Sequence, residues 1–302
     1  MRPPLFSVVI PAYNAAAFIE ATLDSVRKQT FLEFEIIVVD DGSRDGTKDV
    51  VDRWLAKHGL AGRCIRQENA RIAGARNTGL RAAAAEYIAL LDHDDFWHPE
   101  KLAMTAAVFE ANPDAVLVGH HINVVKDGRL MKTARMGPAT ARMYEYLLFT
   151  GNVVSPSAAV FRRDEAIRIG GFRENPSFNT VEDYDFWLRI SHRGRFVFID
   201  RALSDYSVVE NSASRQVEKQ QANLEALLQD HFDSYFHGAP GLRGHFLIRR
   251  RLADSYRGAA GALAAAGATR SEQWKYIRRM LLAYPFGLRN AARALIWFLG
   301  RP

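Results

Sequence analysis

Short apolar runs alternate with amphipathic stretches along the first two thirds of the chain. The runs at 5–10, 34–39 and 87–91 are mostly apolar and have the length of a buried strand. A shorter strand is expected at 63–67. Between the strands apolar residues recur with the period of a helix, as at 18–26, for which Asn14 is the expected N-cap, and a helix rich in small residues is expected at 73–85. This alternation predicts an α/β fold in which helices cover both faces of a doubly wound, mostly parallel sheet.

The pattern changes in the second half of the chain. A helix is expected at 99–111, opened by Pro99, which needs no N–H at the first helical position. Strands are then expected at 115–125, 158–161 and 195–199. Only helices follow, at 212–236, 243–266 and 270–283, with a further segment after Pro285. We therefore expect an α/β domain at 1–210, with halves 1–112 and 113–210, and a helical region at 211–302.

The composition is that of an ordinary globular protein, with 302 residues of which 48% are hydrophobic and 25% charged. Cys64 is the single cysteine, which excludes an internal disulfide and favours a reducing, cytoplasmic location. The first apolar run is short and ends in Pro11 without a small-residue cleavage site, so we expect no signal peptide. No stretch approaches the roughly 18 uninterrupted apolar residues of a membrane-spanning helix.

The net charge of +6 is concentrated near the C-terminus. From Arg243 to Arg301, twelve Arg or Lys residues outnumber two acidic residues, so this segment alone carries about +10. Past Pro285 arginines are interleaved with Trp and Phe, which is typical of a helix lying on an anionic membrane surface. The alternative is packing on the α/β domain or on a second subunit. Nucleic acid is disfavoured because no base-reading motif accompanies the charge, and the pattern indicates no oligomeric state.

Three carboxylates, Asp92, Asp94 and Asp95, follow the buried run at 87–91. Ligands of open α/β sheets bind at the carboxyl ends of strands. If the backbone stays extended, Asp92 and Asp94 project to one side and repel each other unless a cation lies between them. Oxygen ligands suit Mg²⁺ or Mn²⁺. The alternative is a solvated acidic loop that caps the helix at Pro99.

Other side chains near the same edge of the sheet have candidate roles in binding a nucleotide, each with a plainer alternative. Tyr13 could stack on a base, or only cap the sheet. Asp41 could accept a hydrogen bond from a base or ribose, or form an Asx turn with the following Gly-Ser. Arg76 could reach a base or a phosphate, or lie on the surface. Gly79 lets its helix approach the sheet closely.

Four motifs together resemble glycosyltransferase family 2 in both order and spacing. They are VVIPAYN at 8–14, VVDDGS at 38–43, GARNTG at 74–79 and LDHDD at 91–95. The resemblance extends over roughly residues 5–210. It implies a GT-A fold, a nucleotide-sugar donor with UDP preferred, a divalent cation and inversion at the anomeric carbon.

The resemblance also implies roles for single residues by their position in these motifs. It assigns the nucleotide to Pro11, Tyr13, Asp41 and Arg76, the ribose or metal side to Asp92, and the metal itself to Asp94. The half at 1–112 then binds the nucleotide, and the half at 113–210 binds the acceptor, a saccharide or lipid-linked saccharide.

On the acceptor side, the Gly-Gly-Phe stretch around Gly171 and the acidic pair Glu182-Asp183 resemble family motifs. Asp183 is then the general base, and we place Gly171, Glu182 and Trp187 on the acceptor side. The alternative is that Thr180 and Asp183 only form a capping-box-like pair that starts the helix. Both can hold, because a helix start is a rigid place for a carboxylate.

The chain departs from the family pattern after Tyr206. Family members often carry an Arg and a His after this tyrosine, near the donor phosphates, whereas Tyr206 is followed here by SVVENS. Neutralisation of the leaving diphosphate must then depend more on the metal, on Arg215 or on a later arginine.

We therefore expect a metal-dependent, inverting glycosyltransferase, in the cytoplasm or peripherally at the inner face of the membrane. The rival is a non-catalytic nucleotide-sugar-binding or scaffold protein on the same fold, which the missing basic residues favour and Asp92, Asp94 and Asp183 oppose. A nucleotidyltransferase is disfavoured, because 11–14 is not a glycine-rich, lysine-bearing phosphate loop. His120 and His121 face opposite ways in a strand, so we interpret them as ordinary half-buried residues rather than a metal site.

Overall fold

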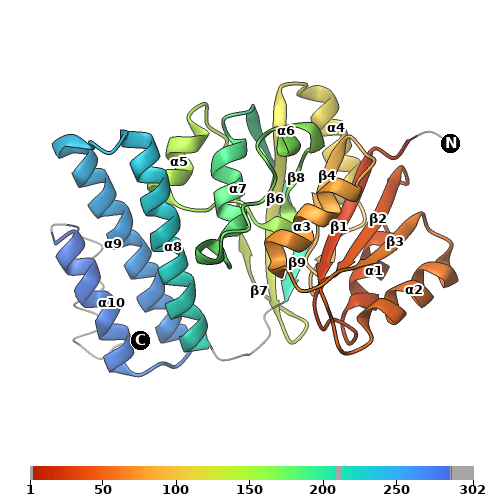
Figure 1. Ribbon diagram of the computed structural model, residues 1–302, viewed down its shortest axis with the longest axis horizontal. Coiled ribbons are helices and arrows are strands. Elements are labelled where there is room, and N and C mark those ends of the chain that lie inside the picture. The colour runs from red at the N-terminus through yellow and green to blue at the C-terminus, as the bar shows by residue number, and fades with distance from the viewer. Residues whose placement is uncertain (1–2, 208–212, 286, 288–302) are drawn as a thin grey trace. The chain divides into compact units, whose positions relative to one another are not determined.

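The computed structural model of the protein describes residues 3–207, 213–285 and 287 (Figure 1). It divides into two compact units. The sheet unit contains Met1–Leu147, Asn152–Glu174 and Glu182–Val209. The helical unit contains Leu148–Gly151, Asn175–Val181 and Glu210–Pro302. The division of the sheet unit into a nucleotide half and an acceptor half stays a prediction.

A single mixed sheet forms the centre of the sheet unit, with strand order β3-β2-β1-β4-β8-β6-β9-β5 and β7 paired to β6. The parallel part comprises β1 (Phe6–Ala12), β2 (Phe34–Asp40), β3 (Gly62–Arg66) and β4 (Tyr87–Leu90). The short strand β8 (Val160–Arg162) is antiparallel to both β4 and β6 (Ala115–Lys126). The remaining strands are β9 (Arg195–Ser207), parallel to β6, then β5 (Phe96–Trp97) and β7 (Arg129–Ala134). The predicted mostly parallel α/β sheet is confirmed for its first four strands, and antiparallel pairing enters beyond β4.

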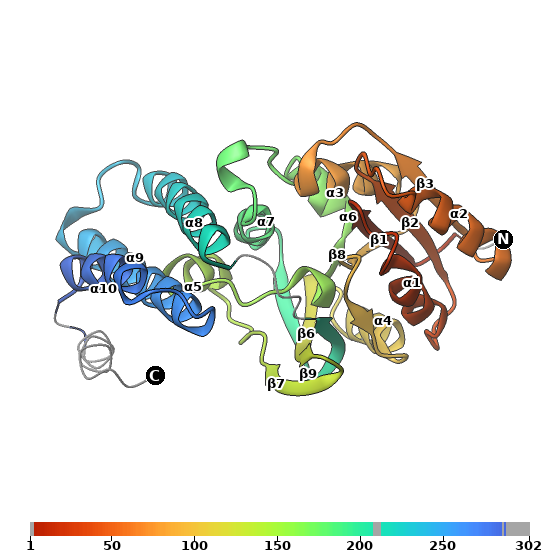
Figure 2. The same cartoon turned by 90° about the horizontal axis from the view of Figure 1, so that it is seen from below.

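Helices cover both faces of this sheet (Figure 2). On one face, α1 (Ile19–Arg27), α2 (Thr47–His58) and α4 (Lys101–Ala111) share a core with alternate residues of β1 such as Val8. On the other face, α3 (Arg71–Ala82) packs on β1 and β2. A Cβ on Gly79 of α3 would lie 2.2 Å from Cγ1 of Val9, so the expected close approach of this helix requires glycine. The doubly wound arrangement is therefore confirmed.

Shorter helices complete the sheet unit. They are α6 (Arg163–Arg168), α7 (Glu182–Ile190) and the 3₁₀ turn η1 (Pro156–Ala158). The residues of α5 (Met143–Thr150) are divided between the two units after Leu147. The helix that carries Asp183 was expected from the sequence.

Two expected helix starts are wrong. Asn14 does not cap α1, because β1 continues to Ala12 and α1 begins only at Ile19. Asn14 instead has a φ of 50°, and its Oδ1 accepts a hydrogen bond of 2.9 Å from the backbone N–H of Arg44. Pro99 likewise precedes α4 rather than opening it, and its carbonyl accepts a hydrogen bond from the N–H of Thr30.

The two adjacent histidines of β6 differ in burial. His120 is fully buried, and burial lowers the pKa of its imidazole well below the usual value. His121 is partly buried, and its Nε2 lies 2.9 Å from Oδ1 of Asp200. The interpretation as half-buried residues is therefore wrong for His120, which belongs to the core.

The helical unit contains α8 (Ala213–Phe236), α9 (Gly241–Ala265), α10 (Arg270–Ala283) and the 3₁₀ turn η2 (Pro176–Phe178). The helix α9 packs against both α8 and α10, and a core including Tyr256, Tyr276 and Met280 fills the space between α9 and α10. A capping box between Thr269 and Glu272 starts α10. The predicted apolar and basic segment after Pro285 lies outside the described residues. Across the described part of the chain, no helix is long and apolar enough to span a bilayer.

Candidate active site

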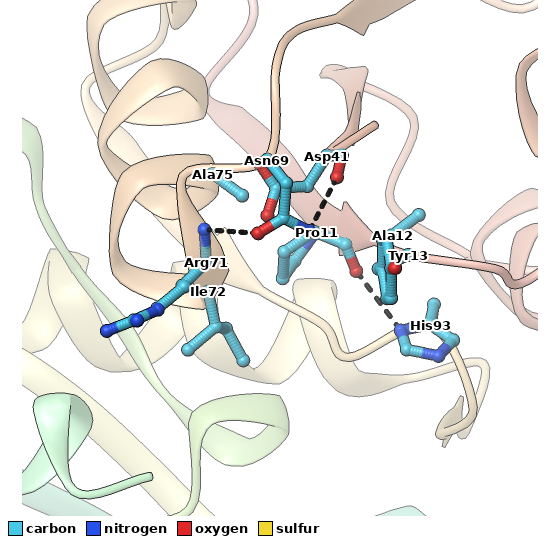
Figure 3. A pocket seen from close by; sticks show the side chains of 9 residues that line it. All are labelled: Pro11, Ala12, Tyr13, Asp41, Asn69, Arg71, Ile72, Ala75 and His93. Atoms are coloured by element: carbon cyan, nitrogen blue, oxygen red, sulfur yellow. Dashed lines mark hydrogen bonds between the residues drawn. The ribbon is translucent and has the colours of Figure 1, made fainter. Parts of the chain in front are cut away.

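A pocket of about 270 Å³ opens at the carboxyl ends of β1 and β2 and the start of α3 (Figure 3). Its lining residues are Pro11, Ala12, Tyr13, Asp41, Asn69, Arg71, Ile72, Ala75 and His93. Three of the predicted nucleotide-binding residues, Pro11, Tyr13 and Asp41, thus meet in one cavity. Sequence reasoning missed Asn69, Arg71 and His93 as lining residues. Their signal was position alone: Asn69 and Arg71 lie five and three residues before the GARNTG motif, and His93 lies inside the acidic motif.

Hydrogen bonds fix Asp41 at the edge of this pocket. Its Oδ1 accepts from Nε2 of Gln67 at 2.7 Å and from the backbone N–H of Ala70 at 2.8 Å, while Asn69 donates to its carbonyl. The alternative role for Asp41, an Asx turn with the following Gly-Ser, is wrong, because the N–H of Ser43 donates instead to Oδ1 of Asp40, three residues earlier, at 3.0 Å. Among the described residues, Oδ2 of Asp41 has no hydrogen-bond partner, so it remains available to a ligand that donates an N–H or O–H.

The chain turns sharply after β4 instead of staying extended. The N–H of Asp95 donates to the carbonyl of Asp92 at 3.1 Å, which closes a turn at 93–94. The same turn is held by Ser157, which accepts from the N–H of Asp92, and by Thr22, which donates to the carbonyl of His93. The extended backbone that would place Asp92 and Asp94 on one side is therefore wrong, because a turn has no alternation of side-chain direction.

The turn carries three carboxylates, Asp92, Asp94 and Asp95, and is called the acidic turn below. Burial and mutual repulsion act on these side chains. Burial, and then the charge of Asp92, raise the pKa of Asp95 to about 8. Burial and Asp92 also raise the pKa of Asp94, although His93 opposes the shift. Oδ1 of Asp95 is buried and has no hydrogen-bond partner in the described part of the chain. A divalent cation would remove both the repulsion and the unsatisfied oxygen, so these side chains fit one.

The described residues contain no preformed metal cage. Within 3–207, 213–285 and 287, no group of three or more His, Cys, Asp or Glu side chains lies close enough together to hold an ion. An ion held by one or two carboxylates and completed by substrate phosphates needs no such cage. The carboxylates of the acidic turn are compatible with that second kind of site, and metal binding by them stays a prediction.

Arg76 connects the acidic turn to α7. Its guanidinium is buried and donates to Oδ1 of Asp92 at 2.9 Å and to Oε1 of Glu182 at 2.7 Å. The alternative of a surface arginine is therefore wrong. Because both carboxylates occupy the guanidinium, direct contact between Arg76 and a nucleotide stays a prediction.

Asp183 lies in the first turn of α7, next to Glu182. Its Oδ2 accepts a hydrogen bond of 3.2 Å from Nδ2 of Asn152. Burial, and then the neighbouring charge of Glu182, raise the pKa of the Asp183 carboxyl to about 7, and Arg76 partly offsets this shift. A carboxylate with that pKa can accept a proton near neutral pH.

The backbone around Gly171 is tied to both α3 and α7. Gly171 has a φ of 69°, and a Cβ there would lie 2.5 Å from Oδ1 of Asn77, so the position requires glycine. That oxygen accepts from the N–H of Phe172 at 2.8 Å. From α7, Arg189 donates to the carbonyl of Gly171 at 2.7 Å and is itself paired with the fully buried Asp185. Sequence reasoning did not assign these supporting roles to Asn77, Asp185 or Arg189.

Trp187 does not face solvent. Its side chain is 0% exposed and packs against the rings of Phe161 and Phe186 in the core. Trp187 therefore anchors α7 in the core. Its buried position does not support the predicted contact with an acceptor.

Tyr206 lies near the end of β9, partly exposed. Burial, and then the charges of Asp95, Asp94 and Asp92, raise the pKa of its hydroxyl, so the tyrosine lies within electrostatic range of the acidic turn. The residues 208–212 that follow it, and the side chain of Arg215, lie outside the described part of the chain.

Sequence comparison links this geometry to one family. Residues 7–170, more than half of the chain, match the sequence model described as Glycosyl transferase family 2. The amylovoran biosynthesis glycosyltransferase AmsB of Erwinia amylovora is 31% identical over 224 residues, which cover 71% of this chain and 73% of that protein. The chondroitin synthase of Escherichia coli is 29% identical over 226 residues, which cover 74% of this chain but 32% of that longer protein.

Solved structures share the fold. TarS of S. aureus, residues 1–349 in complex with UDP-GlcNAc, superimposes with a TM-score of 0.60 at 19% identity and covers 98% of this chain and 92% of that one. The mannosyltransferase PcManGT of Pyrobaculum calidifontis, in complex with GDP-Man and Mn²⁺, gives 0.59 at 22% identity, covering 97% and 85%. The expected GT-A fold is confirmed.

Proposed function

The chain belongs to glycosyl transferase family 2, and from that premise we propose that it is a metal-dependent, inverting enzyme. It transfers a sugar from a nucleotide sugar, with UDP preferred, to a saccharide or lipid-linked saccharide. One observation carries this proposal: the buried guanidinium of Arg76 joins Asp92, beside the donor pocket, to Glu182, the neighbour of Asp183. Donor-side carboxylates and the candidate base thus belong to one connected site.

The pocket at the ends of β1 and β2 takes the nucleoside part of the donor. Tyr13 is 48% exposed at this pocket and offers a ring for stacking on a base. Oδ2 of Asp41 accepts a hydrogen bond, and uracil carries a ring N–H that donates one. The fixed position of Asp41 supports a planar base with a donor N–H as the ligand.

Asp94, with Asp92, would hold Mn²⁺ or Mg²⁺ when a donor is bound. The raised pKa of Asp94 and Asp95 and the buried, unsatisfied oxygen of Asp95 support this assignment. The cation supplies positive charge that stabilises the departing diphosphate. Its identity as Mn²⁺ or Mg²⁺ is decided by measurement of binding with each.

The chemical step is a single displacement. The acceptor hydroxyl attacks the anomeric carbon, and the bond from that carbon to the diphosphate oxygen breaks on the opposite face, which inverts the configuration. Asp183 takes the hydroxyl proton as the new bond forms. Its pKa of about 7 leaves it largely ionised just above neutral pH and still basic enough to accept the proton. Asn152 holds one oxygen of the carboxylate, which leaves the other for the acceptor.

A polysaccharide chain is the proposed acceptor class, because AmsB is named for amylovoran biosynthesis and another relative for chondroitin synthesis. A peripheral position on an anionic membrane fits the helical unit. On α9, Leu242 is 94% exposed and Phe246 is 49% exposed, and Arg243, Arg249 and Arg250 lie exposed on the same helix. An apolar surface flanked by arginines is typical of a helix that rests on a membrane.

The experiment is a binding panel of UDP- and GDP-sugars in Mn²⁺, Mg²⁺ or EDTA, followed by transfer to saccharide acceptors and NMR assignment of the product anomer. We expect metal-enhanced binding of one donor and a product of inverted configuration. Binding without transfer to any acceptor would favour the non-catalytic alternative. A product that retains the donor configuration would contradict the single displacement.

A further inference from the structure

Arg71 has an unusual backbone for its residue type. It is the first residue of α3 and has a φ of 63°, in the left-handed region that glycine adopts without steric cost. A non-glycine residue in this region persists where its surroundings hold it there, and such positions gather at ligand-binding sites.

The surroundings of Arg71 are part of the donor pocket. Its N–H donates to Oδ1 of Asn69 at 3.3 Å, and Asn69 in turn donates through Nδ2 to the carbonyl of Asp41 at 3.0 Å. The N–H of Ala70 donates to Oδ1 of Asp41. Asp41, which the family resemblance assigns to the nucleotide, therefore also fixes the backbone from which Arg71 extends.

The charge of Arg71 is not neutralised by an ion pair within the described residues, in contrast to that of Arg76. Arg71 is exposed, and no ion pair or side-chain hydrogen bond of the described chain involves its guanidinium. It is also the only lysine or arginine among the described residues that line the pocket. Arg76, five residues along the same helix, is neutralised by Asp92 and Glu182.

A nucleoside diphosphate in this pocket would add negative charge beside carboxylates. The pocket adjoins the acidic turn through His93, so the phosphates of a bound donor would lie near Asp92, Asp94 and Asp95. The basic residues that family members carry after Tyr206 are missing from the sequence. In Figure 3, Arg71 and Ile72 lie on one side of the pocket, and Tyr13 and His93 on the other. There the Arg71 side chain extends outward from the rim, and a different staggered rotamer is needed to turn the guanidinium toward the opening.

We propose that Arg71 ion-pairs with the diphosphate of the bound donor and contributes the positive charge that the region after Tyr206 lacks. This inference rests on the proposed function, because it requires a nucleoside diphosphate in the pocket. A guanidinium binds phosphate oxygens through paired N–H groups, which lysine or glutamine cannot reproduce.

The test compares Arg71→Gln and Arg71→Gly with the wild type and with Arg53→Gln, which removes an exposed arginine of α2 outside the pocket. Calorimetry measures the affinity for UDP and for uridine in EDTA, with GDP and guanosine in parallel, and thermal unfolding is followed for each variant. Both Arg71 variants should bind the nucleoside diphosphate about tenfold more weakly and bind the nucleoside unchanged. Arg71→Gly should have an unchanged or higher melting temperature, since glycine adopts a φ of 63° freely. Arg53→Gln should match the wild type.

Unchanged affinity for the nucleoside diphosphate in both Arg71 variants would overturn the inference and leave the proposed function intact. An equal loss for nucleoside and nucleoside diphosphate would also overturn it, since the side chain would then act on the base. A wild-type protein that binds neither UDP nor GDP, with or without Mn²⁺, would contradict the proposed function and this inference together.

Discussion

The guanidinium of Arg76 lies 2.7 Å from Oε1 of Glu182, a residue 106 positions later in the chain, and both side chains are buried. This ion pair joins α3 to α7 and brings the carboxylates of the acidic turn into the same network through Asp92. A buried ion pair gains little over an apolar pair, but loss of one partner leaves an uncompensated buried charge.

Replacement of Arg76 by alanine should therefore lower the free energy of unfolding by about 3–5 kcal/mol. Chemical denaturation followed by circular dichroism measures this loss. The matched control is Arg81→Ala, an exposed position on the same helix, which should leave the unfolding midpoint almost unchanged. A loss below about 1 kcal/mol for Arg76→Ala would show that the pair is not a structural link.

Asp94→Ala should remove the enhancement of UDP binding by Mn²⁺, because in the proposed function this carboxylate would hold the cation that offsets the phosphate charge. UDP affinity in EDTA should be no lower than in the wild type, since the variant removes a negative charge from the site. Isothermal calorimetry in the two buffers measures both affinities. Asp49→Ala, an exposed acidic position on α2, serves as the control for the loss of one negative charge. Retention of the full Mn²⁺ effect in Asp94→Ala would assign the metal elsewhere.

Asp183→Asn should keep the fold and the donor affinity and lower the turnover by on the order of 10² to 10⁴, the usual span for loss of a general base. Asparagine is close in size, and its amide oxygen still accepts hydrogen bonds. Transfer rate, donor affinity and melting temperature are measured side by side, with Asp164→Asn on α6 as an exposed control. Near-normal turnover would move the proton acceptor to another carboxylate.

The activity of the enzyme should rise with pH through about 7, because Asp183 must be ionised to accept a proton and its pKa is raised to about 7. The rate kcat/KM for the acceptor, measured from pH 5.5 to 8.5, should show a single acid limb. A flat profile across this range would contradict the role of Asp183.

The free energy of unfolding should fall as the pH rises, whereas the activity should increase. The carboxyls of Asp183 and Asp95 have pKa values of about 7 and about 8 in the folded state, above the ordinary 3.8. Between about pH 4 and 8 the unfolded chain has released protons that the folded chain still holds, so the free energy of unfolding falls as the pH rises. Asp183→Asn should flatten part of this fall in melting temperature, measured in EDTA without nucleotide.

Full-length protein should sediment with anionic liposomes at low ionic strength and be released as salt increases, if the helical unit rests on a membrane. The double variant Leu242→Ser with Phe246→Ser should weaken sedimentation. The control is Leu130→Ser with Met131→Ser, which removes two apolar side chains of similar exposure from β7 in the sheet unit. Equal sedimentation of both variants would assign α9 a different partner.

The sequence predicted the sheet well because its central strands are mostly apolar runs with the length of a buried strand. The position of Asp41 near a strand end indicated a site at that edge of the sheet, whereas Pro11 and Tyr13 were assigned to a nucleotide by the family resemblance. It did not predict that Arg76 is buried, since the carboxylate of Glu182 is remote in the chain and no local pattern records such a partner. The turn at 93–94 was missed for a similar reason: the hydrogen bonds that hold it come from Ser157 and Thr22. The burial of Trp187 depends on rings from other elements, among them Phe161 of β8.

The helix α3 contributes to the donor pocket through Arg71 and Ile72 and holds the backbone next to Gly171 through Asn77. Six residues of an α-helix between Arg71 and Asn77 fix an axial offset of ~9 Å. The pocket and the backbone at Gly171 are therefore spaced by the helical rise, which is insensitive to side-chain identity. In the proposed function, substitutions around Gly171 that alter acceptor choice would leave nucleotide recognition undisturbed, whereas an inserted residue within α3 would rotate one contact by about 100° relative to the other.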